Sequence, residues 1–282
     1  MVLVHLKNSE ENQFLCEIPV STDVDLVIRL LVSIYNLRLK IGRLAGHAKD
    51  LCEHGVAKPP DQQGLDEVIE ETANMAISEK GETYKADPTG RRTGIAPTKE
   101  MAGVIRRQLD EAQSCISKDQ VSKRVLLSKE ILEEAISRIN GAVKIVYPGG
   151  LPEYDPVREE LENKEQLEGS QASLEVMDGD TCTLWWAGKQ LLRGQKMEVF
   201  VGKNEKTKIV AKLQKKGSGP PVRESPVDSD TQKAMLSYYY KKQEEQKKLV
   251  EDMEDSYLNS DWADPKSLKR HFQGVSNVSW RP

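Results

Sequence analysis

Residues 24–35 constrain the fold more than any other segment, because they form an apolar stripe directly after two strand-like runs. Residues 2–6 alternate apolar and other side chains, and residues 13–20 form a second such run after a turn-prone linker. Ser21, Thr22 and Asp23 offer an N-cap at the start of the stripe. Apolar residues then recur at spacings of three and four: Val24, Val27, Ile28, Leu31, Ile34 and Tyr35. The sequence therefore predicts a hairpin followed by an amphipathic helix.

A hairpin followed by an amphipathic helix is how a β-grasp (ubiquitin-like) module begins, although other small α+β folds begin in the same way. We expect this module in residues 1–60, with Leu44 to Pro60 as the segment that returns to the sheet. Residues 61–95 lose the apolar periodicity and gain glycine and proline, which predicts a linker or an elaborated loop. The fold class is therefore α+β.

Residues 96–216 are expected to form a second α+β unit. Its clearest predicted strand is Ala142–Tyr147 (AVKIVY), which follows Gly141 and ends at Pro148. A further strand is expected at 173–177. Helices are expected at 98–117, at 128–140, from Asp155-Pro156 onward, and at 184–193 with Trp185 buried.

A hinge is predicted at residues 217–227, where the sequence GSGPPVRESP gathers glycine, serine and proline. Residues 228–282 are expected to form a charged helix, from Thr231 to about Asp255, followed by a short capped helix that Trp262 and Trp280 flank and that carries Phe272. Two tryptophans so close to a chain end indicate a docked segment. It either clasps the protein's own body or binds a partner.

Charge and targeting signals place limits on the function. The net charge is −4, from 41 basic and 45 acidic residues, which argues against general affinity for nucleic acids. The N-terminus lacks a secretory signal, and no stretch approaches the roughly 20 apolar residues that cross a bilayer. The four cysteines are widely spaced, as in a reducing cytosol. We expect a soluble intracellular protein.

Catalytic and metal-binding motifs have no specific support. The run VGKNEKTK fails as a phosphate-binding loop, because Met197 and Asn204 occupy positions that require glycine and a hydroxyl residue. His47, Cys52 and His54 could supply three metal ligands, but no second ligand pair follows them. We therefore expect no catalytic residues, no metal and no cofactor, and a protein that is not an enzyme.

Two neighbouring segments carry opposite charge. Residues 153–180 contain ten acidic residues, and residues 189–216 contain nine lysines and arginines. The two segments could pair with each other, each exposed pair contributing about 0–1 kcal/mol. Alternatively, the lysines could form a salt-sensitive patch for an acidic partner. The candidate contact residues of that patch are Lys203, Lys206, Lys208 and Lys212.

Two aromatic clusters stand out, Trp185-Trp186 and Tyr238-Tyr239-Tyr240. On a helix, consecutive side chains point about 100° apart, so at least one tryptophan and one tyrosine are expected to be partly exposed. Exposed aromatic side chains beside cations are typical of interface anchors, although burial beneath the C-terminal segment would account for them equally well. The candidate anchors are Trp186, Tyr239, Trp262, Phe272 and Trp280.

Long strings of this sequence resemble one known family. They are YLNSDWADPKSLKRHFQGVSNVSWRP at the C-terminus, VGKNEKTKIVAKLQ, YPGGLPEYDPVREELENKEQL, LWWAGKQL, GRRTGIAPTKEM and the N-terminal pattern MVLVHLK…QFLCEIP…EHGVAKPP. Together they make nearly the whole chain similar to the Kurly family (cilia- and flagella-associated protein 298). The resemblance implies a non-enzymatic protein needed for motile cilia and linked to cytoplasmic assembly of outer dynein arms.

Two functions from different classes remain open. The first is an adaptor whose partners, as the resemblance implies, are dynein-arm assembly factors and axonemal dynein subunits. The second is a structural component of the axoneme, part of the cytoskeleton, that binds acidic tubulin surface through the lysine-rich segment. The expected locations are the cytoplasm and the cilium or flagellum, including the basal body.

Overall fold

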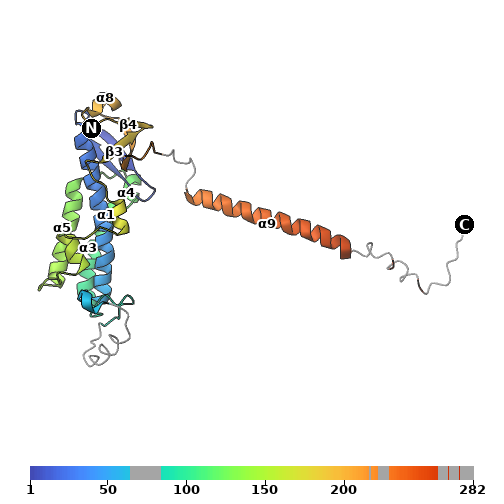
Figure 1. Ribbon diagram of the computed structural model, residues 1–282, viewed down its shortest axis with the longest axis horizontal. Helices are drawn as coiled ribbons and strands as arrows, with labels where there is room; N and C mark the ends of the chain where they lie inside the picture. The colour runs from blue at the N-terminus through green and yellow to red at the C-terminus, as the bar shows by residue number, and fades with distance from the viewer. Residues whose placement is uncertain (64–83, 216, 222–228, 260–265, 267–272, 274–282) are drawn as a thin grey trace. The chain divides into compact units, whose positions relative to one another are not determined.

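The computed structural model describes residues 1–63, 84–215, 217–221 and 229–259, together with positions 266 and 273 (Figure 1). The chain divides into two compact units, Met1–Pro221 and Val222–Pro282. The division falls inside the segment predicted as a hinge. In the described part of the chain, no helix combines the length and the apolar character that a membrane span requires.

The first unit contains a five-stranded mixed sheet in the order β2-β1-β5-β3-β4. β1 and β2 form the predicted antiparallel hairpin, and β1 lies parallel to β5 at the centre of the sheet. This strand order, with a parallel central pair, is that of the β-grasp fold. The strands are β1 Val2–Lys7, β2 Gln13–Ile18, β3 Cys182–Trp186, β4 Lys189–Leu191 and β5 Lys208–Lys215.

Helix α1 (Val24–His54) connects the sheet to a helical bundle. Its first half packs against the sheet, where Ile28 and Leu31 are completely buried with Val4 and Leu6 of β1. Alternate residues of β1 and β5 face this helix, which explains the period of two in these two segments of the sequence. Its second half continues past the sheet, and α3 and α5 lie beside it in Figure 1.

The bundle consists of the second half of α1 with α3 (Lys99–Ile116) and α5 (Lys129–Val146). Its core is continuous with that of the sheet, and its fully buried side chains include Leu44, Leu51, Ile105, Leu109, Leu132 and Ile139. The shorter helices are η1 Pro60–Gln62, α4 Asp119–Ser122, α6 Pro156–Leu161, α7 Gln171–Glu175 and α8 Met197–Val201. The second unit contains α9 (Ser229–Asn259).

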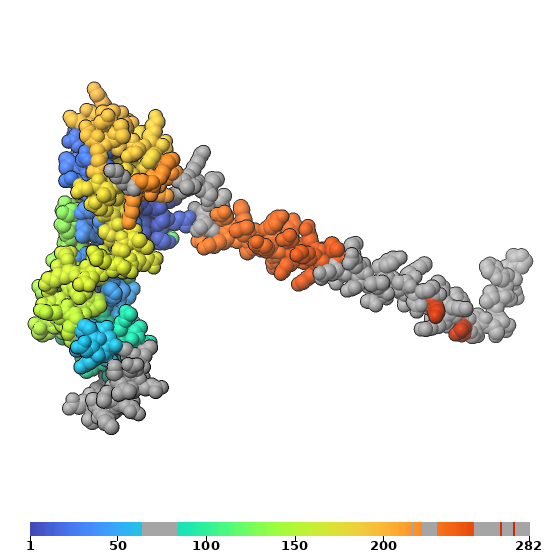
Figure 2. Space-filling model, viewed as in Figure 1, coloured from blue at the N-terminus to red at the C-terminus, as the bar shows by residue number. Residues whose placement is uncertain are grey.

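The expectation that Leu44–Pro60 returns to the sheet is wrong, because Leu44 lies inside α1, which continues to His54. The returning strands are β3, β4 and β5, more than a hundred residues later. The β-grasp sheet is therefore not confined to residues 1–60, and the strands of residues 96–216 belong to that same sheet. Figure 2 shows the late residues, in yellow and orange, joining the blue N-terminal residues at one end of the unit.

The strand predicted at Ala142–Tyr147 is helical, because α5 does not stop at Gly141. Ala142 and Val143 are buried on the same stripe as Leu132 and Ile139, so the helical period of the apolar residues continues through this segment. Gly141 is exposed and lacks a tight neighbour, so it is tolerated within the helix. The helix ends where Pro148 disfavours helical geometry at Tyr147.

The helix predicted at 184–193 is instead the hairpin of β3 and β4. Ala187 and Gly188 both have positive φ, 48° and 75°, which is the backbone that a two-residue hairpin turn requires. The strand predicted at 173–177 is also wrong, since Gln171–Glu175 forms the short helix α7.

Several predicted boundaries are confirmed. Thr98 and Ser117 flank α3, and the Ser128 hydroxyl accepts a hydrogen bond from the Ile131 N–H at the start of α5. Asp155 caps α6 by accepting a hydrogen bond from the Val157 N–H at 3.0 Å. The charged helix expected from Thr231 is α9. Residues 64–83 of the predicted loop, residues 222–228, Trp262, Phe272 and Trp280 lie outside the described residues.

Gly55, which follows α1, gives a testable prediction. Its φ is +74°, and a Cβ atom built there would lie 2.0 Å from the carbonyl oxygen of Ile95. Gly55→Ala should therefore destabilise the protein by roughly 2–4 kcal/mol, from backbone strain and displacement of residues 93–95. Gly46→Ala is the control, because this exposed position inside α1 is open and alanine there should stabilise by about 0.5–1 kcal/mol. Chemical denaturation measures both, and equal effects would contradict the account.

Candidate partner-binding surface

The sheet face opposite α1 presents a mixed apolar and basic surface. On β5, Ile209, Ala211 and Leu213 are buried, whereas Lys208 and Val210 are exposed and Lys212 is partly exposed. Val210 retains 59% of its surface and pairs with His5 of β1. We call the outward residues of the three central strands the open sheet face: Leu3, His5, Trp185, Lys208, Val210 and Lys212.

Strand alternation separates the two neighbouring tryptophans. Trp186 shares its parity with the buried residues Cys182 and Leu184 and packs, partly buried, against the core. Trp185 points to the opposite face, where its indole N–H donates to the Thr183 hydroxyl at 3.1 Å. Trp185 is also the cross-strand neighbour of Lys212. Of the two, Trp185 therefore lies on the open sheet face.

The four candidate lysines all precede or belong to β5. Lys203 and Lys206 are exposed in the loop between α8 and β5, and Lys208 and Lys212 follow on the strand. Among the residues that the structure describes, none of the four side chains forms an ion pair or a hydrogen bond. The acid in their own loop, Glu205, pairs with the N-terminal amine at 3.4 Å. We call these four residues the lysine strip.

Among the described residues, no ion pair joins the acidic segment 153–180 to the basic segment 189–216, so the alternative in which the two segments neutralise each other is not realised. The acidic segment's main long-range partners lie on α1: Arg43 with Glu165 at 2.7 Å, His47 with Glu160 at 2.8 Å and Arg29 with Asp180 at 2.9 Å. Nearer contacts join Arg158 to Glu153 and Glu162. Glu160, Glu165 and Asp180 are thereby paired with α1, and the lysine strip keeps its positive charge for another molecule.

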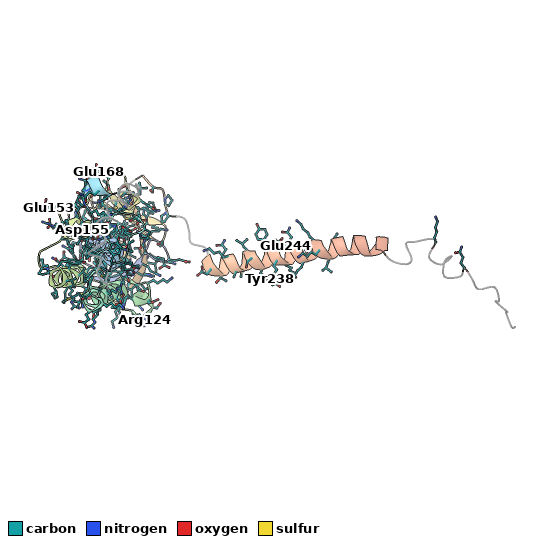
Figure 3. All side chains as sticks on the ribbon, turned by 90° about the horizontal axis from the view of Figure 1, so that it is seen from below. Arg124, Glu153, Asp155, Glu168, Tyr238 and Glu244 are labelled. Atoms are coloured by element: carbon teal, nitrogen blue, oxygen red, sulfur yellow. The ribbon has the colours of Figure 1, made fainter. Side chains whose placement is uncertain are left out.

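A buried polar network fixes the start of the acidic segment. Asp155 is completely buried and accepts hydrogen bonds from the N–H groups of Ala57 and Val157, both at 3.0 Å. Arg92, 7% exposed, lies 3.5 Å from the same carboxylate and donates to the carbonyls of Gly55 and His47. Figure 3 labels Asp155 within this unit and Glu153 and Glu168 along the acidic segment.

His47 makes the attachment of the acidic segment sensitive to pH. The hydrogen bond that the His47 imidazole donates to the Glu160 carboxylate raises the pKa of His47 above its ordinary value of 6.5, against the opposing effect of burial. Because the pKa of His47 is higher in the folded than in the unfolded protein, its ion pair with Glu160 stabilises the fold fully below the unfolded-state pKa. This stabilisation is lost as the pH rises through the folded-state pKa.

His47→Gln should therefore lower the free energy of unfolding more at about pH 5.5 than at about pH 9. The difference should stay below about 1 kcal/mol, because the imidazole is half-exposed. Denaturation curves of both proteins at the two pH values measure it. A larger deficit at the higher pH would contradict the assignment.

The tyrosine cluster belongs to the second unit. Tyr238, Tyr239 and Tyr240 each keep 65–68% of their surface exposed on α9. Their described neighbours along the helix are exposed as well. Tyr238 is labelled on this helix in Figure 3. The expectation that at least one tyrosine is exposed is confirmed.

Comparison with known proteins identifies the family. A family model described as "Cilia- and flagella-associated protein 298" matches residues 182–278. The whole chain is 46% identical to cilia- and flagella-associated protein 298 of Homo sapiens and 45% identical to that of Danio rerio, each alignment covering 100% of both chains. The chain belongs to the cilia- and flagella-associated protein 298 family.

The Kurly resemblance is thereby confirmed, and a cilium-related role follows from it. The Drosophila melanogaster member is 40% identical over 100% of this chain and 99% of its own. No solved structure matches. The matched range 182–278 begins at β3 and includes the lysine strip, so the family model covers most of the candidate surface.

A cavity of about 340 Å³ lies between α5 and α6, away from the candidate surface. Its lining includes the apolar side chains of Val143, Leu151 and Leu161. Arg158 at its edge is held by the Leu151 carbonyl and by Glu162. Across the described ranges, no three histidine, cysteine or carboxylate side chains are grouped as metal ligands would be.

Sequence reasoning selected the four lysines, but it expected Trp185 to be buried and chose Trp186 as the anchor, whereas Trp186 packs against the core and Trp185 lies on the open sheet face. Val210 was not selected. The signal that would have found Trp185 and Val210 is the strand period of two, in which successive side chains point to opposite faces. Thr183 and Trp185 alternate with Cys182, Leu184 and Trp186, and Val210 lies two residues from a lysine on either side. An interpretation of residues 184–193 as a helix concealed it.

Proposed function

We propose that this protein is a non-enzymatic adaptor for motile cilia, acting in the cytoplasm and at the basal body in the assembly of outer dynein arms. The observation that carries the proposal is the lysine strip, which lacks an acidic partner among the described residues, while Glu160 and Glu165 of the acidic segment pair with α1. An uncompensated basic strip around an apolar centre suits an acidic protein partner. We propose dynein-arm assembly factors and axonemal dynein subunits as the partners.

The absence of enzymatic activity is part of the same proposal. The residues that line the 340 Å³ cavity include neither cysteine nor histidine, and its arginine is engaged by Leu151 and Glu162. Burial raises the pKa of the Cys16 and Cys52 thiols to about 11, which disfavours the reactive thiolate. These features support a protein that acts through binding.

A second candidate function rests on the same surface. Tubulin is strongly acidic, so the lysine strip could bind the microtubule wall of the axoneme, and the protein would then be a structural component. Salt dependence distinguishes microtubule binding through the lysines from binding through apolar contacts. If the lysines bind, the fraction of protein bound to microtubules should fall as ionic strength rises, because exposed charges are screened beyond about 10 Å at 0.1 M.

Two measurements separate the candidates. Proximity labelling in ciliated cells should recover dynein-arm assembly factors, and reversal of all four lysines to glutamate should remove them. Co-sedimentation of the purified protein with microtubules should leave it in the supernatant. Salt-sensitive pelleting with microtubules, together with labelling confined to tubulin, would replace the adaptor proposal with the axonemal one.

A further inference from the structure

Helix α9 exposes large apolar and aromatic side chains along its described part. Every side chain from Asp230 to Val250 is exposed, including large apolar and aromatic ones. Leu236 retains 51% of its surface, Tyr239 67% and Val250 59%. A helix in a protein takes most of its stability from packing of an apolar face. The described side chains of α9, residues 230–250, therefore present a face that another element should cover.

The spacing of that face is that of a coiled coil. Leu236, Tyr239, Gln243, Gln246 and Val250 follow one another at intervals of three, four, three and four. This alternation defines the central seam of a heptad repeat, in which the two seam positions of each heptad meet the partner helix. Tyr240 and Lys247 flank the seam on one side, and Lys242 and Leu249 flank it on the other.

We propose that α9 pairs with α9 of a second copy of this chain in an antiparallel coiled coil. The two-fold axis would pass between Glu244 and Glu245. In this register Tyr239 packs on Val250 of the second copy, and Gln243 meets Gln246, each pair occurring twice by symmetry. The two amide side chains can hydrogen-bond to each other at the centre. The same helix thus supplies a matching partner for four of its own five seam positions.

Charge on the flanks decides the orientation. In a parallel pair, Lys242 of each helix would lie beside Lys247 of the other, so two lysine pairs would repel each other. In the antiparallel pair, Lys247 lies beside the ring of Tyr240, where a cation is attracted to an aromatic face. Lys242 then lies beside Leu249, which its aliphatic stem can cover. Glu244 and Glu245 point away from the seam.

Cysteine cross-linking of the full chain tests both the pairing and its direction. The background carries Cys115→Ser, since the other three native cysteines are buried. Equal amounts of Tyr239→Cys and Val250→Cys proteins, with different tags, are mixed and mildly oxidised. The mixed disulfide should form in several-fold excess over either homodimeric disulfide. Glu244→Cys is the control: it lies near the axis but outside the seam, and it should not cross-link.

Sedimentation under reducing conditions provides the second measurement. The unmodified protein should show a dimer whose fraction rises with concentration, and Tyr239→Glu should be monomeric with unchanged helix content. Homodimeric disulfides from each single variant would indicate parallel pairing and overturn the proposal. So would a protein that is monomeric at every concentration and forms no mixed disulfide.

Discussion

Asp155→Ala should lower the free energy of unfolding by about 3–5 kcal/mol, the largest stability effect that we expect from a single substitution. The carboxylate is completely buried and accepts hydrogen bonds from two backbone N–H groups, on Ala57 and Val157. Alanine would leave both donors unsatisfied and Arg92 buried without its counter-charge. Chemical denaturation at neutral pH measures the loss.

Two controls separate this network from ordinary ion pairing. Asp155→Asn keeps one hydrogen-bond acceptor in a side chain of the same shape, so it should lower the free energy of unfolding less than Asp155→Ala does. Asp180→Ala removes the carboxylate that pairs with Arg29 at the surface, where both side chains are largely exposed, and should cost about 0–1 kcal/mol. An Asp155→Ala protein within 1 kcal/mol of the unmodified protein would show that the network does not anchor the acidic segment.

Reversal of the lysine strip should have the largest effect on binding. We expect the unmodified protein to bind a fluorescent glutamate-rich peptide, and the four-lysine-to-glutamate variant to lose that binding. If each reversal costs roughly 1 kcal/mol, the four together weaken binding on the order of several hundred-fold. Fluorescence anisotropy measures the affinities, and raising the salt from about 50 to 300 mM should weaken the unmodified protein's binding markedly.

A matched variant controls for net charge. Lys99, Arg107, Lys123 and Lys144 are exposed cations elsewhere in the first unit, and their reversal changes the charge by the same amount. This control should keep most of the peptide affinity, because these residues do not share a strand. Equal losses in the two variants would mean that the peptide responds to total charge alone.

The sequence correctly predicted the structural elements that depend on neighbouring residues. The hairpin of β1 and β2, the start of α1 at Asp23 and the Asp155 cap of α6 all depend on residues within a few positions. The β-grasp class was also correct, but its later strands were assigned to the wrong residues. Parallel pairing of β1 with β5 joins residues some two hundred positions apart, and no local pattern encodes that distance.

The same limit applies to the candidate surface. The sequence identified the lysines, but it left open whether they pair with the acidic segment 153–180 or bind another molecule. The answer depends on which other cations, such as those of α1, lie beside that segment in the fold. Arg43 and His47 of α1 bind Glu165 and Glu160, so these two carboxylates do not pair with the lysine strip. AVKIVY was misread for a related reason: a short apolar run suits a buried strand or a buried helix equally, and only packing of Ala142 and Val143 in the bundle decides between them.

Rescue of ciliary motility tests the central claim, that this protein acts through its unpaired lysine strip, most directly. Cells that lack the protein are supplied with the unmodified chain, the four-lysine variant or the matched-charge control, and beat frequency and outer dynein arms are scored. We predict that the unmodified chain and the control restore both and that the lysine variant, although folded and equally abundant, restores neither. Full motility with the reversed strip would contradict the account.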